Sequence, residues 1–201
     1  MNASSRILAL PALAATLVVA AVCAPAAVGE TPTTTSSCPT YQFTQAFSWA
    51  KDSNWYTLMS GQTVDNFGGN GWTLSGGASV TTTPLANGKT GSVLDLPSGS
   101  MAVSPTICVT RDYPRARMMV RNVKGSEGVF FHVSYLGTST WDKPKNTGQV
   151  HGSGTAWTAA DPINLQPYGV SGYQTVKFTF KPGGKTSRFQ VYNVYVDPRM
   201  K

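Results

Sequence analysis

The sequence has few charged residues. They make up 12% of its 201 residues, and only nine of them are acidic. No internal repeat of fixed period and no heptad pattern is visible, which argues against repeat architectures and coiled coils. Glycine (20 residues) and proline (13 residues) are instead plentiful, and short apolar stretches lie between them. This composition is typical of an all-β extracellular domain and argues against a helical one.

Groups that could carry catalysis are also scarce. The sequence has two histidines, His132 and His151. His132 and Ser134 share one face of a predicted strand, but no Gly-x-Ser-x-Gly elbow or acid partner accompanies them, so they form no triad. Asp142 and Asp161 could form the carboxylate pair of a glycosidase, yet they lie in separate loops without a supporting pattern. We therefore predict that the protein is not an enzyme and that it needs no cofactor.

The longest apolar stretch lies at the N-terminus. Residues 1–29 carry one basic residue, Arg6, followed by an apolar stretch and then by small residues. This order is that of a secretory signal peptide. An uncleaved membrane anchor fits less well, because the stretch is rich in alanine and is broken by Pro11 and Pro25. We expect residues 1–29 to be removed, no membrane span to remain, and the mature protein to be secreted or held at the cell envelope.

The sequence has three cysteines. Cys23 is expected to leave with the signal peptide, because the residues before it make a poor lipidation site. Cys38 and Cys108 remain, and an exported chain with one pair of cysteines usually oxidises it. The alternative is two free, buried thiols. Their spacing matches no metal site, so we predict a Cys38–Cys108 disulfide and no bound metal.

Beyond the signal peptide, the sequence predicts one domain of short strands. Residues 30–37 are polar, have nothing to bury and are predicted to form a flexible leader. Residues 38–201 show strand patterns separated by glycine and proline turns. Strands are predicted at residues 55–59, 92–96, 101–109 with a break at Pro105, 117–123, 129–136, 174–181 and 187–196. Residues 157–162 could contain one helical turn. With residues 101–109 divided at Pro105 and the extended residues 71–80 included, these segments make eight or nine short strands, which predict a two-sheet antiparallel β-sandwich, and specifically a jelly roll.

Residues 71–80 are expected to anchor the core. Trp72 and Leu74 point the same way along an extended chain, so both can enter one core. The glycines around them allow sharp turns, and the second turn leads to Ala78 and Val80.

The predicted inward positions of the last two strands differ in regularity. In residues 174–181 the apolar residues alternate cleanly, so we expect Val176, Phe178 and Phe180 to point inward. In the last strand the apolar residues change phase at Tyr192 and Asn193. A bulge there would put the apolar residues before and after it on the same face.

The chain resembles a group of small secreted actinobacterial proteins, mostly uncharacterised, with a galactose-binding-like jelly roll. The matching stretches are residues 47–56, 71–80, 104–109, 121–122 and 194–198. The resemblance implies a sandwich related to carbohydrate-binding modules, and it implies no known activity. Related modules often carry acids before the Trp and before the last valines, and such acids ligate calcium. This chain has Phe67-Gly68 and Tyr192-Asn193 there, which removes those ligands.

The positive charge gives an indication of the partner. The net charge is +7, but the basic residues are scattered and no run of three occurs. Nucleic-acid binding proteins usually gather such residues in one patch, so we do not expect a nucleic-acid partner. A secreted basic protein is better suited to an anionic cell wall or an extracellular glycan.

Candidate ligand-binding residues follow from how proteins hold sugars, with aromatic faces and a few polar side chains in an open groove. Trp141 lies in a polar loop where no core needs it, so we expect it to be exposed. Trp157 lies near a turn, and Arg117, Arg121 and His132 could line one sheet face. The alternative for each aromatic residue is packing against the edge of the sandwich. We predict a secreted, non-catalytic module that binds a carbohydrate or cell-envelope glycan. The alternative is a structural or adhesive surface protein without a small-molecule ligand.

Overall fold

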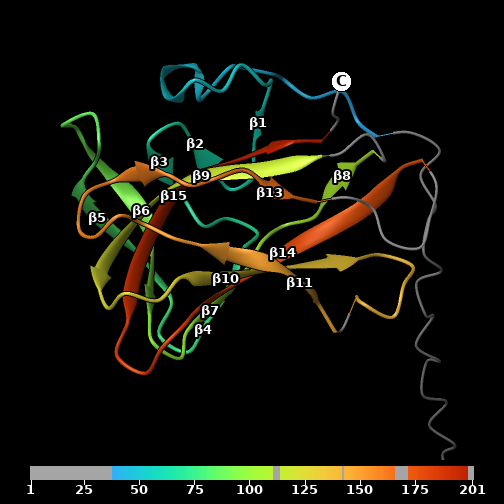
Figure 1. The fold of residues 1–201 in the computed structure, drawn as a ribbon. Coiled ribbons are helices and arrows are strands. Elements are labelled where there is room, and N and C mark those ends of the chain that lie inside the picture. The colour runs from blue at the N-terminus through green and yellow to red at the C-terminus, as the bar shows by residue number, and fades with distance from the viewer. Residues whose placement is uncertain (1–37, 111–113, 142, 166–171, 199–201) are drawn as a thin grey trace, which may run out of the picture. The chain divides into compact units, whose positions relative to one another are not determined.

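The structure, a computed structural model, describes residues 38–110, 114–141, 143–165 and 172–198, and the predicted signal peptide and leader lie outside these residues. The described part is almost entirely β (Figure 1). Its elements are η1 (Ser48–Ala50), β1 (Thr57–Leu58), β2 (Gln62–Thr63), β3 (Asn66–Phe67), β4 (Thr73–Ser75), β5 (Ser79–Pro84), β6 (Thr90–Pro97), β7 (Met101–Val103), β8 (Ile107–Val109), β9 (Arg115–Lys124), β10 (Val129–Tyr135), β11 (Lys145–Val150), β12 (Thr158–Ala159), β13 (Ile163–Asn164), β14 (Gln174–Pro182) and β15 (Arg188–Asp197). Within these ranges, no helix has the length and apolar character needed to cross a membrane.

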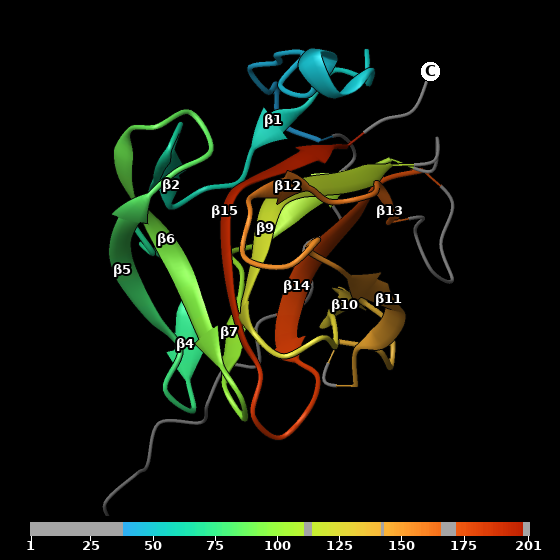
Figure 2. The same ribbon diagram turned by 60° about the vertical axis from the view of Figure 1, so that its left-hand side comes forward.

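The strands form two sheets whose pairings are antiparallel, apart from a parallel pairing of β3 with β6. The nine-stranded sheet has the order β12-β9-β15-β6-β3-β2, with β1 beside β15, β5 beside β6 and β13 beside β9. The six-stranded sheet has the order β11-β10-β14-β7-β4, with β8 beside β14 (Figure 2). The last two strands complete both sheets, because β14 lies between β10 and β7 while β15 lies between β9 and β6. The predicted all-β jelly-roll sandwich is confirmed.

The main core lies between the two sheets. Val176, Phe178 and Phe180 of β14 are fully buried there, as their alternation predicts. The bulge predicted in β15 is also present. The register between β15 and β9 shifts between Tyr192 and Tyr195, and Asn193 has a left-handed backbone with φ of 50°. This bulge brings Phe189, Val191, Val194 and Val196 into the same core.

Trp72 is a core residue, with 8% of its surface exposed. Its ring centroid lies 4.9 Å from that of Phe67 and 5.7 Å from that of Phe180, and its indole N–H donates to the Ser60 carbonyl at 2.9 Å. Gly61 passes beneath it, where a Cβ would lie 2.1 Å from a backbone oxygen. Only glycine tolerates this approach together with a φ of 82°.

The other side chains of residues 71–80 are less buried than Trp72. Leu74 is half-buried and packs against the same core, as predicted, and Ala78 does so too. Val80, in contrast, is 40% exposed.

Several short strands were not predicted from the sequence. The helical turn expected in residues 157–162 is wrong, because Thr158–Ala159 forms strand β12 and pairs with β9. Strand β13 pairs with β9 as well. Pairing satisfies backbone groups that the edge of β9 would otherwise leave open. β11 carries Lys-Asn-Thr-Gly-Gln-Val, which has no apolar alternation by which to recognise it.

The N-terminal part of the domain crosses the outer face of the nine-stranded sheet. We call residues 44–56 the strap. Its ends are joined by a bridge between Thr44 and Tyr56, and two of its aromatic residues enter a second apolar cluster beneath it. The buried members of this cluster are Phe47, Tyr56, Leu85, Val93, Met119, Tyr192 and Tyr195. The outer face of this sheet is therefore covered by apolar packing.

The predicted Cys38–Cys108 disulfide is present, with its Cα atoms 5.3 Å apart. It joins the chain just before the strap to β8, across 70 residues of sequence. Tyr41 supports the same junction, because its hydroxyl accepts the Cys108 backbone N–H at 3.1 Å.

Removing the disulfide is expected to destabilise the domain. Replacing both Cys38 and Cys108 by Ala should lower the free energy of unfolding by about 2–4 kcal/mol, since a closed loop of this size restricts the unfolded chain. Urea unfolding of the double variant measures the loss, and the parent protein in reductant is the control that should match it. Unchanged stability in both would show that the disulfide does not contribute to the fold.

Candidate ligand-binding sites

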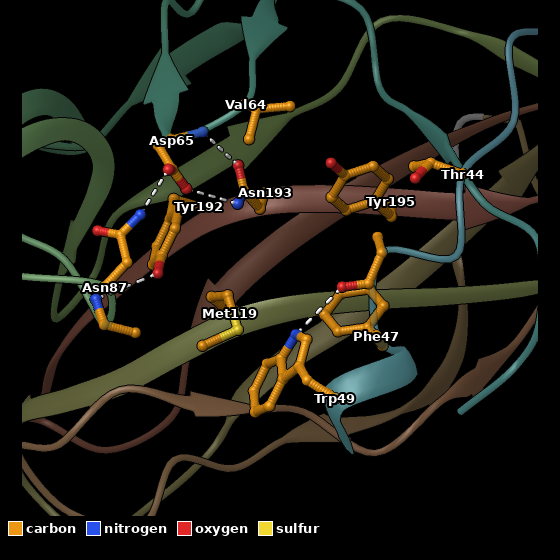
Figure 3. A pocket seen from close by; sticks show the side chains of 12 residues that line it. Thr44, Phe47, Trp49, Val64, Asp65, Asn87, Met119, Tyr192, Asn193 and Tyr195 are labelled. Carbon is orange, nitrogen blue, oxygen red and sulfur yellow. Dashed lines mark hydrogen bonds between the residues drawn. The ribbon is translucent and has the colours of Figure 1, made fainter. Parts of the chain in front are cut away.

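A pocket of about 650 Å³ lies between the strap and the outer face of the nine-stranded sheet (Figure 3). We call it the strap pocket. It is lined by Thr44, Ala46, Phe47, Trp49, Val64, Asp65, Ala86, Asn87, Met119, Tyr192, Asn193 and Tyr195. Its lining is mostly apolar and aromatic with a few polar groups, which is the usual make-up of a small-molecule site.

Trp49 is the most exposed tryptophan of the described residues, at 65%. It lies on η1, and its indole N–H donates to the Ala46 carbonyl at 3.1 Å, which fixes the ring beside the pocket (Figure 3). The turn ends at Lys51, whose backbone is left-handed. An exposed indole that is held in place offers a flat apolar face to a ligand.

Polar side chains gather on the opposite side of the strap pocket from Trp49 (Figure 3). The Asp65 carboxylate accepts N–H groups from Asn87 at 2.7 Å and from Asn193 at 3.0 Å. The Asp65 backbone N–H donates to the Asn193 side-chain oxygen at 2.8 Å. Asp65 and Asn193 both have left-handed backbones, with φ of 62° and 50°. The bulge in β15 therefore has two effects. It keeps the apolar residues of β15 in the core on one face of the sheet, and it directs Asn193 toward the strap pocket on the other face.

Two tyrosines, Tyr192 and Tyr195, also line the pocket, and both hydroxyls are uncharged at neutral pH. Burial raises the pKa of Tyr192, whose hydroxyl accepts the Ala86 backbone N–H at 3.3 Å. Burial likewise raises the pKa of Tyr195. The pocket thus combines an exposed indole, neutral phenols and a fixed carboxylate with two amides.

Arg117, one of the predicted ligand-binding residues, is instead buried beneath the strap. Its guanidinium donates to the Asp52 carboxylate at 2.6 Å and to the Ala160 carbonyl at 2.7 Å. The Tyr56 hydroxyl donates to the same carboxylate at 2.7 Å. Arg117 also lies 5.0 Å from the centre of the Phe47 ring. These contacts hold the strap on β9, so the role of Arg117 in the structure is to stabilise the fold.

Arg121 and Trp157 lie together on the outer face of the same sheet. The guanidinium carbon of Arg121 is 4.6 Å from the centre of the Trp157 ring. Arg121 donates to the Gln190 side-chain oxygen at 2.6 and 2.9 Å and to the Thr83 hydroxyl at 2.7 Å. The Trp157 ring packs edge-on to Tyr192 at 4.7 Å. Trp157 is therefore part of the sandwich packing, next to the strap pocket.

The expectation that Arg117, Arg121 and His132 line one sheet face is wrong. Both arginines are on β9 of the nine-stranded sheet, whereas His132 is on β10 of the six-stranded sheet. The connection from β9 to β10 crosses between the sheets, and the sequence patterns of the two strands do not reveal this. The five predicted residues therefore fall into groups on opposite faces.

His132 and Trp141 meet at a groove of about 300 Å³ on the outer face of the six-stranded sheet. We call it the β14 groove. It is lined by Met101, Val103, His132, Ser134, Trp141, Pro144, Lys177, Thr179 and Lys181. Trp141 is half-buried, so it is less exposed than predicted. The reason is that the Lys177 ammonium lies 4.1 Å from the centre of its ring.

Among the described residues, His132 and Ser134 are not hydrogen-bonded to each other and no cluster of metal ligands is found. The buried Ser134 hydroxyl makes no hydrogen bond to any described group, so His132 and Ser134 form no proton relay. No three His, Cys, Asp or Glu side chains gather as metal ligands within the ranges described above. Asp142, one of the two acids considered for a glycosidase, lies outside those ranges.

Comparisons with known proteins give likenesses of fold alone. No protein-family model matches the chain, and no curated protein matches it either. Among solved structures, it is similar to a xylan-binding domain of Paenibacillus barcinonensis, at 12% identity, covering 65% of this chain and 88% of that one with a TM-score of 0.43. It is also similar to a family 6 carbohydrate-binding module of Clostridium cellulolyticum solved with xylose, at 17% identity over 59% of this chain and 85% of that one with a TM-score of 0.40. A third similar structure is the module TmCBM61 with β-1,4-galactotriose, at 12% identity over 64% and 88% with a TM-score of 0.40.

Proposed function

We propose that this protein is a secreted, non-catalytic module that binds a glycan in the strap pocket. The observation that carries the proposal is the exposed indole of Trp49 facing Asp65, Asn87 and Asn193 across one pocket. A pyranose ring has an apolar face and a rim of hydroxyls. The indole suits that face, while the carboxylate and amides suit the hydroxyls.

The polar side chains of the pocket hold one another in place. Asp65 and Asn193 are held by two hydrogen bonds to each other, and Asp65 also accepts from Asn87. A site that is already formed loses less conformational entropy when it binds. Asn87 is exposed at the end of this set, so its amide is accessible to a ligand hydroxyl.

Secretion is the second part of the proposal. A disulfide persists in oxidising compartments outside the cytosol, and the Cys38–Cys108 bond fits such a location. Residues 1–29 supply the proposed export signal. A cell-wall or extracellular glycan is then the partner that such a module meets first.

A glycan array with the protein lacking residues 1–29 tests the proposal. Trp49→Ala is expected to weaken binding of the captured glycan by up to about tenfold, because stacking on an aromatic ring contributes about 0.5–1.5 kcal/mol. Trp55→Ala is the matched control. Trp55 is also exposed, at 46%, but it does not line the strap pocket.

Two outcomes would contradict the proposal. The first is that no glycan binds the parent protein, which favours the alternative of a structural or adhesive surface protein. The second is that Trp49→Ala and Trp55→Ala bind the captured glycan as well as the parent does. The melting temperatures of both variants should stay within a few degrees of the parent's, since both rings are exposed.

A further inference from the structure

The β14 groove carries a pattern of charge that the strap pocket lacks. Lys177 and Lys181 are four residues apart on β14, so they share its outer face with about 13 Å between their Cα atoms. Thr179 lies between them and is paired with His132 on β10. None of the described residues that line the groove is acidic. The groove is therefore a positive strip with neutral hydrogen-bonding groups between its two cations.

One polar group in the groove has no partner. The Ser134 hydroxyl is fully buried and makes no hydrogen bond within the described part of the chain. A buried hydroxyl left unbonded costs free energy, so such groups usually have a partner. Ser134 is paired with Lys177 in the sheet and lines the groove. Because Ser134 has no exposed surface, a ligand in the groove would contact the other polar side chains, Thr179 and His132.

His132 adds a neutral hydrogen-bonding group. Burial lowers the pKa of His132, and the nearby positive charge of Lys181 lowers it further. At neutral pH the imidazole is therefore uncharged, with one nitrogen that donates and one that accepts. Both kinds of hydrogen bond suit a sugar hydroxyl.

We propose that the β14 groove binds an acidic polysaccharide whose sugar rings carry carboxylates. The carboxylates bind Lys177 and Lys181 through charge-assisted hydrogen bonds, and the hydroxyls between them bind Thr179 and His132. The groove lies on the opposite sheet from the strap pocket, so this inference does not depend on the function proposed for that pocket.

A nucleic acid fits the groove less well. Single strands need successive aromatic platforms on which bases stack. Among the described lining residues Trp141 is the sole aromatic ring apart from the imidazole of His132, and the Lys177 ammonium lies over its face. The spacing of two lysines around small polar groups therefore favours a uronic-acid polymer.

Calorimetric titration with polygalacturonate tests the inference, using the protein without residues 1–29. Neutral β-1,4-galactan, polyglutamate and single-stranded DNA serve as comparison ligands. The double variant Lys177→Gln/Lys181→Gln is expected to bind polygalacturonate at least about tenfold more weakly than the parent. Lys89→Gln/Lys185→Gln is the matched control, since it removes the same charge from exposed turns outside the groove and should bind as the parent does.

Two single variants provide further tests. Lys177→Arg should keep the binding because it keeps the charge, and Trp49→Ala should keep it because the strap pocket is separate. The inference is overturned if polygalacturonate does not bind, or if galactan binds equally well. It is also overturned if polyglutamate or DNA binds more tightly, or if both double variants lose affinity equally. Near-ultraviolet circular dichroism of each variant verifies that the fold is retained.

Discussion

Trp72→Ala is expected to lower the free energy of unfolding by about 3–5 kcal/mol, as is usual when a large buried aromatic residue is truncated. The ring lies in the main core against Phe67 and Phe180, and its N–H satisfies the Ser60 carbonyl. Its removal leaves a cavity and an unsatisfied carbonyl together. The surrounding chain cannot easily collapse into the space, because Gly61 already lies against the ring and its neighbours are packed β-strands.

Urea unfolding measures this effect, and Trp55→Ala provides the comparison. Trp55 is 46% exposed, so its removal should change the free energy of unfolding by well under about 1 kcal/mol. Equal stabilities for the parent and Trp72→Ala would contradict the placement of this ring in the core.

Arg117→Ala is expected to cost about 3–5 kcal/mol, since it leaves a buried carboxylate without its cation. Asp52 and Arg117 have side chains that are only 8% and 10% exposed, and their contact is 2.6 Å. Lys89→Ala removes the same charge from an exposed turn and should change stability little. A loss no larger than that of Lys89→Ala would show that the pair does not hold the strap.

The same ion pair predicts a dependence on pH. Burial alone raises the pKa of Asp52, but the hydrogen bonds from Tyr56, Asn54 and Arg117 together outweigh it, so the net pKa lies below its usual value. A lowered carboxylate pKa stabilises the fold above the unfolded-state pKa, near about 4, and this contribution is lost as the pH falls through the folded-state value. The difference between the parent and Arg117→Ala should therefore be full at pH 7 and should shrink below about pH 4. A difference that stays constant from pH 7 to pH 3 would show that Asp52 is not the source of the effect.

The sequence predicted the fold well where one face of a strand is buried and the other is not. The alternation in β14 and the phase change in β15 are direct consequences of packing against a core, so both could be predicted. Two-residue strands such as β12 and β13 could not be predicted, because they form by pairing with β9 and are too short to show an alternation of apolar residues. The disulfide was predictable because only two cysteines follow the predicted signal peptide.

The candidate site was much harder to predict. Whether Arg117 binds a ligand or an internal carboxylate depends on Asp52, which is 65 residues away in sequence. Trp141 was expected to be exposed from its polar loop, but the residue that covers it, Lys177, comes from a distant strand. Trp49 lies in an irregular segment whose exposure follows from the course of the strap. The irregular spacing of its aromatic residues shows neither a strand nor the pocket.

A titration of the five tryptophan indole N–H signals by nuclear magnetic resonance tests the central claim most directly. Each ring reports on a different place: Trp49 on the strap pocket, Trp141 on the β14 groove, Trp157 on the Arg121 contact, Trp72 on the core and Trp55 on open surface. When the glycan captured on the array is added, we predict that the Trp49 signal shifts most, that Trp157 shifts less, and that Trp55 and Trp72 stay in place. A titration in which Trp49 does not move while another indole signal saturates would contradict glycan binding in the strap pocket.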